Sequence, residues 1–251
     1  MTFIDSHCHL DFPQFFDDLS AVLDSARENG VSQFIVPGVK ASAWLSQIEL
    51  CKQNRLHFAL GLHPYFLSEY HPSNIVLLKQ LINDNACIAV GECGIDLTYP
   101  DIKLQQSIFI EHIKVANEYK LPLIVHHRRS HHLIFECFKQ VKPECGGVIH
   151  AFSGSRQDAD KYIQLGFSLG VGGVISYERA IKTRQVIQQV PLQNIILETD
   201  SPDMPLSGLQ GQRNEPKNIE KVAGCLANLR SESLEKIAAQ STQNVIKLFN
   251  L

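Results

Sequence analysis

Two histidines, His7 and His9, stand two residues apart directly after the first apolar stretch of the chain. Residues i and i+2 of a strand point to the same side, so both imidazoles would project together while Cys8 turns to the other side. Neutral imidazole is a common ligand of divalent transition metals. The pair therefore indicates a metal site, although two incidental polar residues at the start of a loop would give the same spacing.

Further groups able to bind a metal end other apolar runs of the chain. They are Glu92, His126, His150 and Asp200. Each has a structural alternative: an ion-paired glutamate, a core histidine bonded to the backbone, or an aspartate that caps a turn. Their joint occurrence at equivalent positions, after runs that are otherwise nearly free of charge, favours one shared site.

The number and type of these side chains predict a site with two ions. Four imidazoles and two carboxylates are more than one tetrahedral ion needs, and a bridging carboxylate would let two ions use all of them. Zn or Mn suits this mixture of ligands, whereas Mg accepts the carboxylates but few imidazoles. We expect two divalent ions (Mg, Mn or Zn) with the ligands His7, His9, Glu92, His126, His150 and Asp200.

Other polar residues are candidates for substrate binding. Arg128 and Arg129 come soon after His126, where they could bind a phosphate, although the same cluster could be a solvated loop. His63, after the third apolar run, and Arg213 are expected as further substrate contacts. Histidines 57, 71 and 112 are expected at the solvated surface, Cys8 and Cys93 in packing, and Glu198 stays unassigned.

The elements that must position these groups alternate along the chain. Eight short apolar runs predict strands at residues 3–4, 33–36, 57–60, 87–90, 123–125, 147–149, 168–171 and 195–197. The stretches between them have helical periodicity: Phe109, Ile113 and Ala116 share one face, Ile219, Val222, Ala223 and Leu226 share another, and a last helix covers about 233–249. This order predicts an α/β fold, best matched by a (β/α)8 TIM barrel, with a doubly wound open sheet as the alternative. In such barrels the carboxyl ends of the strands carry the catalytic residues.

Composition limits the class of protein. The 251 residues are 44% hydrophobic and 20% charged, which allows a sizeable core and predicts one domain over residues 1–251. The net charge of −3 argues against a broad polyanion-binding face. Seven cysteines without a C-x-x-C pair are typical of a reduced cytoplasmic protein. With no leader before Phe3, no membrane-spanning run and no coiled coil, we expect a soluble cytoplasmic monomer without an obligate protein partner.

Several blocks of the chain resemble the TatD family of metal-dependent hydrolases, which are amidohydrolase-type TIM barrels. The blocks are Asp5–Asp11, Gly61–Pro64, Val90–Asp96, Leu121–His126, Val148–Gly154 and Leu197–Pro202. They occur in order over essentially the whole chain. The segments Arg128–His131 and Asp203–Leu206 further resemble the YjjV-type branch of that family.

The resemblance implies particular roles. His7 and His9 would bind one ion with Asp200 beside it, and Glu92 would bridge to a second ion held by His126 and His150. It also implies a deoxyribonuclease that removes nucleotides from DNA ends with Mg or Mn. Many members read His-x-Arg-Asp where this chain has Arg129 in place of the acid, so its substrate contacts are expected to differ.

These observations lead to a two-metal phosphodiester hydrolysis in which Asp200 and Glu92 are catalytic, Asp200 as the general base. Single-stranded DNA or DNA ends are the expected substrate. A hydrolase of a small amide, lactone or phosphoester is the alternative. A metal-binding or scaffold protein with a decayed site is a third possibility, which the intact set of six ligands disfavours.

Overall fold

The computed structural model describes all 251 residues, in which strands and helices alternate in the order of a (β/α)8 barrel. The strands are β1 (Phe3–Asp5), β2 (Val31–Pro37), β3 (His57–Leu60), β4 (Ala89–Asp96), β5 (Leu123–Arg128), β6 (Gly147–Ile149), β7 (Phe167–Val171) and β8 (Ile195–Leu197). The helices are α1 (Leu19–Glu28), α2 (Trp44–Asn54), α3 (Ser73–Asp84), α4 (Ile102–Tyr119), α5 (His131–Gln140), α6 (Arg156–Gln164), α7 (Ile181–Gln189), α8 (Ile219–Arg230) and α9 (Leu234–Phe249). Every apolar run that predicted a strand overlaps one.

The chain forms two compact units that are interleaved in sequence. The first comprises residues 1–36, 151–164 and 168–251, and the second comprises residues 37–150 and 165–167. The expectation of one domain over the whole chain therefore stays a prediction.

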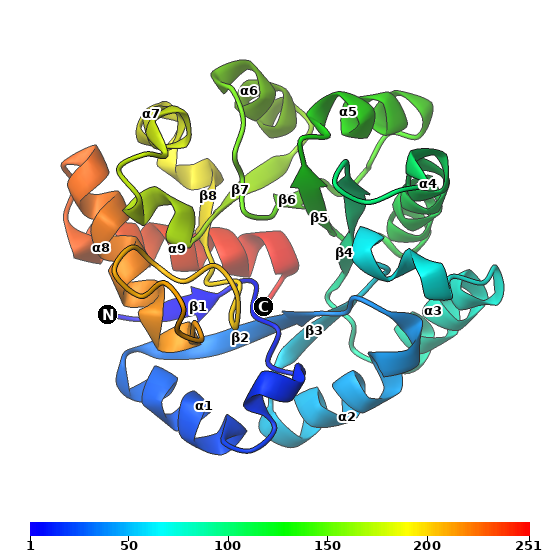
Figure 1. Ribbon diagram of the computed structural model, residues 1–251, viewed down its shortest axis with the longest axis horizontal. Helices are drawn as coiled ribbons and strands as arrows, with labels where there is room; N and C mark the ends of the chain where they lie inside the picture. The colour runs from blue at the N-terminus through cyan, green and yellow to red at the C-terminus, as the bar shows by residue number, and fades with distance from the viewer. The chain divides into compact units, whose positions relative to one another are not determined.

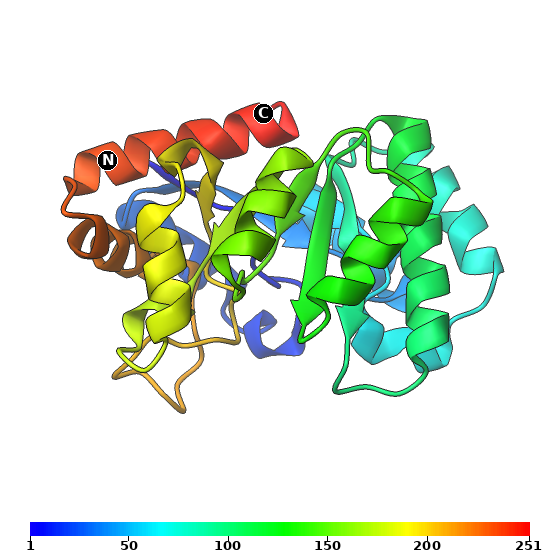
Figure 2. The same cartoon turned by 90° about the horizontal axis from the view of Figure 1, so that it is seen from above.

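In the first unit, β1 pairs with β2 and β7 pairs with β8 in two parallel ladders. Phe3 lies opposite Val31 in the β1–β2 ladder, and Leu169 lies opposite Ile195 in the β7–β8 ladder. Helix α9, which begins one residue after the predicted start, packs against β1 and β8. Figure 2 shows this helix (red) beside the start of the chain, where Thr242 Oγ1 donates to the Thr2 carbonyl at 2.8 Å.

In the second unit, β3 to β6 form a continuous parallel ladder. Ala59 lies opposite Ala89 and Val125 lies opposite Ile149. Helices α4 and α5 pack against β4 and β5 and lie outside them in Figure 1. The apolar faces predicted for α4 and α8 are buried, which explains why these sequences fold as helices on a sheet.

The expectation of a surface position for His112 is wrong. Its ring is fully buried in α4, Nε2 accepts a hydrogen bond from the Leu62 amide at 3.1 Å, and Nδ1 lies 2.8 Å from the Ile108 carbonyl, to which it donates. Burial lowers the pKa of His112 to about 4, so the ring is neutral. The helix buries a wider face than its apolar residues alone indicated. His71 is exposed as expected, whereas His57 is half-buried at the start of β3.

Two further expectations concern cysteines and membranes. All seven cysteines are free thiols, and Cys8 and Cys93 are buried packing residues as expected. None of the helices combines the length and the apolar character that crossing a bilayer requires.

Candidate metal centre

In the first unit, backbone hydrogen bonds beyond the ends of β1 and β8 position three candidate ligands. β1 ends at Asp5, so His7 and His9 lie in the segment that follows it rather than in the strand itself. The Asp200 amide donates to the His7 carbonyl at 2.9 Å, and the His9 amide donates to the Ser201 carbonyl at 2.7 Å. These bonds join residues almost 200 positions apart in the chain.

The donor atoms of these three residues converge. His7 Nε2 and His9 Nε2 are 3.2 Å apart, and Asp200 Oδ1 lies 3.6 Å from the first and 3.5 Å from the second. The histidine rings are almost fully buried, while the Asp200 side chain is 13% exposed. Two imidazole nitrogens and one carboxylate oxygen around one point fit a divalent ion such as Zn or Mn.

A buried network beneath this cluster involves Asp5, which sequence reasoning left unassigned. Asp5 Oδ1 accepts from the amides of Thr199 (3.0 Å) and His7 (3.3 Å), and Oδ2 accepts from Thr199 Oγ1 at 2.5 Å. Burial raises the pKa of Asp5 to about 7, against the lowering effect of these hydrogen bonds. The Asp5 carboxyl group thus connects the segment that carries His7 and His9 to the segment that carries Asp200.

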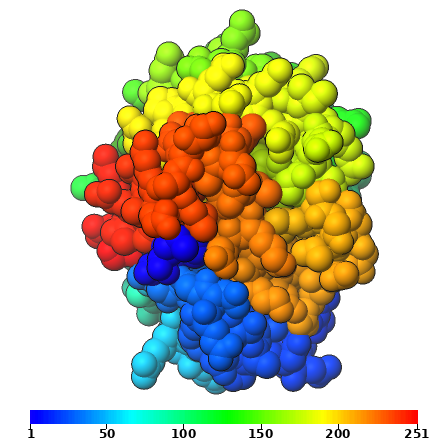
Figure 3. Space-filling model, turned by 90° about the vertical axis from the view of Figure 1, so that its left-hand side faces the viewer, coloured from blue at the N-terminus to red at the C-terminus, as the bar shows by residue number.

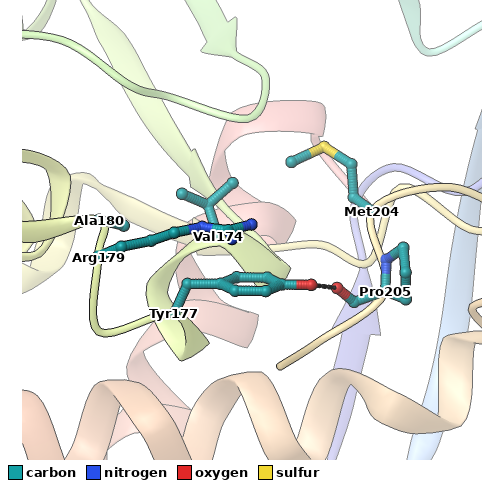
Figure 4. Close-up of a pocket in the computed structure, with 6 residues that line it drawn as sticks. All are labelled: Val174, Tyr177, Arg179, Ala180, Met204 and Pro205. Carbon is teal, nitrogen blue, oxygen red and sulfur yellow. Dashed lines mark hydrogen bonds between the residues drawn. The ribbon is translucent and has the colours of Figure 1, made fainter. Parts of the chain in front are cut away.

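The segment after β8 is held from two sides. Asn214 Nδ2 donates to the Thr199 carbonyl at 2.8 Å, and Tyr177 Oη donates to the Pro205 carbonyl at 2.7 Å. The second bond closes one side of a pocket of about 230 Å³ (Figure 4). Its lining residues are Val174, Tyr177, Arg179, Ala180, Met204 and Pro205. These contacts fix the backbone on both sides of Asp200.

Arg213, a predicted substrate contact, is engaged within the protein. Its guanidinium donates to both carboxylate oxygens of Asp18, at 2.8 and 2.7 Å, and to Glu215 Oε1 at 2.9 Å. Figure 3 shows the surrounding segment (orange) at the surface against the N-terminal region (blue). These bonds give Arg213 a structural role, and its contact with substrate stays a prediction.

In the second unit, Glu92 is the centre of another cluster. Its Oε1 lies 3.0 Å from His126 Nδ1 and 3.5 Å from His63 Nε2, and the three side chains offer donor atoms within 4.8 Å of one another. The carboxylate is buried, so a cation beside it would offset the cost of removing the charge from water. The cluster fits a metal ion, and it contains two of the predicted ligands.

Asp96 completes this cluster and was not singled out from the sequence. Its Oδ2 lies 3.2 Å from His126 Nε2, and its Oδ1 accepts from Thr98 Oγ1 at 2.6 Å. Burial opposes charge on both groups, but their hydrogen bonds outweigh it, lowering the pKa of Asp96 and raising the pKa of His126. The sequence signals were the position of Asp96 four residues after Glu92 and its place at the end of the block Val90–Asp96.

The hydrogen bonds of His63 determine which of its nitrogens carries the proton. Nδ1 accepts from the Tyr65 amide at 3.1 Å, so in the neutral ring the proton is on Nε2, which faces Glu92. This tautomer is a hydrogen-bond donor rather than a metal ligand. It agrees with the expected position of His63 among the substrate contacts.

The other predicted residues of this unit lie after β5 and β6. The His150 amide donates to the Val125 carbonyl at 3.0 Å, and the His150 ring lies 6.4 Å from the His126 ring between centroids. Arg128 is the last residue of β5, Arg129 follows it, and both side chains are exposed. They are therefore available for an anionic ligand.

Two glycines allow close packing around the candidate ligands. A Cβ at Gly94 would lie 2.0 Å from the His126 carbonyl oxygen, at a positive φ of 152°. A Cβ at Gly170 would lie 2.3 Å from Glu198 Oε2, while Glu198 Oε1 accepts from the Ala151 amide at 2.7 Å. Glu198 is thus bonded structurally in the first unit.

Comparison with known proteins gives the family. The model of the TatD-related DNase family matches residues 4–250. The chain belongs to the TatD family. It is 42% identical to the metal-dependent hydrolase YjjV of Escherichia coli K12, over 99% of this chain and 98% of that protein. It is 36% identical to a metal-dependent hydrolase of Haemophilus influenzae over the full length of both. These relationships make the protein a metal-dependent hydrolase.

The same comparison confirms the fold class. The crystal structure of YjjV from E. coli K12 superposes with a TM-score of 0.95 over 99% of this chain and 98% of that one. An organophosphorus hydrolase from Deinococcus radiodurans, 13% identical, shares the fold with a TM-score of 0.65 over 98% of this chain and 92% of that one. The chain is a (β/α)8 barrel rather than a doubly wound open sheet.

Proposed function

We propose that this TatD-family hydrolase is an exonuclease-like deoxyribonuclease with a two-metal site. The observation that carries the proposal is that imidazole and carboxylate donors converge within each of two clusters, one after β1 and β8 and one on β4 and β5, in a family described as DNases. In a (β/α)8 barrel, the carboxyl ends of the strands gather at one face. We therefore propose that both donor sets belong to a single active site.

In this proposal, His7, His9 and Asp200 would hold one divalent ion, and Glu92, His126 and His150 would hold a second. The ions, when bound, lower the pKa of a water molecule and neutralise charge that develops on the attacked phosphate. Asp200 is the general base, because its carboxylate is partly exposed next to two imidazoles. Glu92 is the second catalytic residue. Its buried carboxylate is held at a fixed position beside His126.

The remaining polar residues orient the substrate. His63 donates from Nε2 to a phosphate or leaving-group oxygen, and Arg128 and Arg129 bind the flanking phosphates. Arg213 is a weaker candidate for the same role, because Asp18 and Glu215 already accept its donors. With a net charge of −3, attraction for a polyanion would come from these local cations rather than from a broad basic face.

We propose single-stranded DNA or DNA ends as the substrate, with Mg, Mn or Zn as the metal. We also propose that the protein is a monomer and that it is cytoplasmic, the second of which the seven free thiols support. The slightly acidic charge favours one alternative, a hydrolase of a small amide, lactone or phosphoester that uses the same residues.

A substrate panel separates these two functions. Labelled single-stranded DNA, the matched RNA, a lactone and a simple phosphoester are each incubated with the protein and Mg²⁺ or Mn²⁺. We expect progressive shortening of the DNA from an end, with kcat/KM at least about 100-fold above that for the small esters. Turnover of a lactone or phosphoester without cleavage of DNA would contradict the proposal and favour the alternative.

A further inference from the structure

Three aromatic rings of the second unit form a row after β3 and β4. Tyr65 and Phe66 lie in the helical turn Pro64–Glu69, with ring centroids 4.7 Å apart, and Tyr99 lies 5.0 Å from Tyr65. Successive rings are nearly perpendicular, at 87° and 80°. Tyr65 is 54% exposed, which is unusual for a large aromatic side chain that already contacts two others. We call these three side chains the aromatic platform.

A cation lies near each end of the aromatic platform. Lys40 Nζ is 5.5 Å from the centroid of the Phe66 ring. Arg128 pairs with Asp96 in the β4–β5 ladder, and its carbonyl accepts from the Leu97 amide at 3.1 Å, two residues before Tyr99. Burial raises the pKa of the Tyr99 hydroxyl, whereas the nearby charge of Arg128 acts to lower it. The row of three aromatic rings therefore has a positive charge near each of its two ends.

The recess beside Phe66 contains one acidic side chain. This recess has a volume of about 260 Å³, and Lys40 and Glu69 are among its lining residues. Glu69 Oε2 accepts a hydrogen bond from Ser42 Oγ at 3.1 Å, so part of its acceptor capacity is used within the protein.

Hydrogen bonds connect the aromatic platform to the candidate catalytic residues. The Tyr65 amide donates to His63 Nδ1 at 3.1 Å, and His63 Nε2 faces Glu92 Oε1 at 3.5 Å. The Tyr99 amide donates to the Asp96 carbonyl at 3.3 Å, and the Asp96 carboxylate faces His126 at 3.2 Å. Both tyrosines are therefore held at fixed positions relative to the cluster around Glu92.

We propose that the aromatic platform stacks unpaired bases of a single-stranded nucleic acid, while Lys40 and Arg128 bind its phosphates. Proteins that bind single strands combine a cationic groove with aromatic faces on which successive bases stack. A base within a duplex is already stacked and cannot offer its face, so the platform selects unpaired ends. This inference rests on the proposed function and deepens it by naming the residues that recognise the unpaired strand.

The test compares an oligonucleotide that carries bases with one of the same length that is abasic over the nucleotides next to the cleaved end. Binding is measured by fluorescence anisotropy and cleavage by KM and kcat, with Mg²⁺ present. The proteins are wild type, Tyr65→Ala and Tyr65→Phe. Tyr119→Ala is the matched control, because Tyr119 ends α4 before β5, away from the carboxyl ends of the strands, and accepts from Asn83 at 3.2 Å.

We expect wild type to bind the base-carrying strand about 5- to 150-fold more tightly for each stacked base, with the effect on KM rather than kcat. Tyr65→Ala should reduce this ratio at least about fivefold, whereas Tyr65→Phe and Tyr119→Ala should keep it. Equal ratios in wild type and Tyr65→Ala would overturn the inference. Cleavage of neither strand by wild type would instead contradict the proposed function, and the anisotropy ratios would still decide whether the platform binds bases.

Discussion

The buried His112 predicts a specific pH dependence of stability. Its pKa is about 4 in the folded protein and 6.5 in the unfolded chain, because burial disfavours the charged ring. Above pH 6.5 the ring is neutral in both states and contributes no pH dependence. As pH falls below 6.5 the unfolded chain binds the proton first, so the free energy of unfolding falls until pH reaches about 4.

The magnitude follows from the difference between the two pKa values. A shift of about 2.5 units corresponds to ~3 kcal/mol, of which ~2 kcal/mol is already lost at pH 5. His112→Gln removes this titration, while the amide can still accept from Leu62 and donate to Ile108. Urea unfolding of both proteins between pH 8 and pH 5 measures the effect, since other titrating groups cancel in the difference. Parallel curves of unfolding free energy against pH would refute the reasoning.

Three further predictions concern the metal, the packing and the substrate. Mn²⁺ at 100 times its Kd should raise the free energy of unfolding of the wild-type protein by ~2.7 kcal/mol and its Tm by about 5–10 °C. Calorimetry should find less than half of this rise in Tm for Asp200→Asn. Gly94→Ala should cost about 2–5 kcal/mol in urea unfolding because its Cβ meets a backbone oxygen at 2.0 Å, whereas Gly224→Ala, with nothing within 4 Å, should cost nothing. Arg128→Ala should raise KM for an oligonucleotide. It should also weaken the salt dependence of binding, so that the slope of log affinity against log salt concentration falls by about 0.7 per lost phosphate contact. Arg156→Ala, which removes another exposed arginine, should change neither quantity.

The strand pattern could be predicted because each strand is a short apolar run bounded by polar residues. The ends of the strands were less predictable. β1 ends at Asp5, before His7, while β4 and β5 continue through Glu92 and His126 as far as Asp96 and Arg128. Polar residues extend these two strands because they pair with one another in a parallel ladder, and a single sequence does not show which polar residue has a strand partner.

The candidate site was predictable where the residue types are themselves unusual. Imidazoles two residues apart and a glutamate after an apolar run predict a metal site once they occur together with other such residues at the ends of predicted strands. Asp5 and Asp96 gave no comparable signal, because an aspartate at a strand end is common and its partners, Thr199 and His126, are distant in sequence. The prediction of a surface position for His112 was wrong for a related reason. The hydrogen bond that its ring accepts from the Leu62 amide depends on tertiary packing, which the sequence does not show.

Metal-dependent cleavage of end-labelled single-stranded DNA tests the central claim most directly. Metal-free protein is mixed with the oligonucleotide, and Mn²⁺ is then added to wild type and to Glu92→Ala in parallel, with circular dichroism as the check of folding. We predict that wild type shortens the strand only after addition of Mn²⁺, and that folded Glu92→Ala leaves it intact. Cleavage by Glu92→Ala at the wild-type rate, or no cleavage by metal-loaded wild type, would contradict the account.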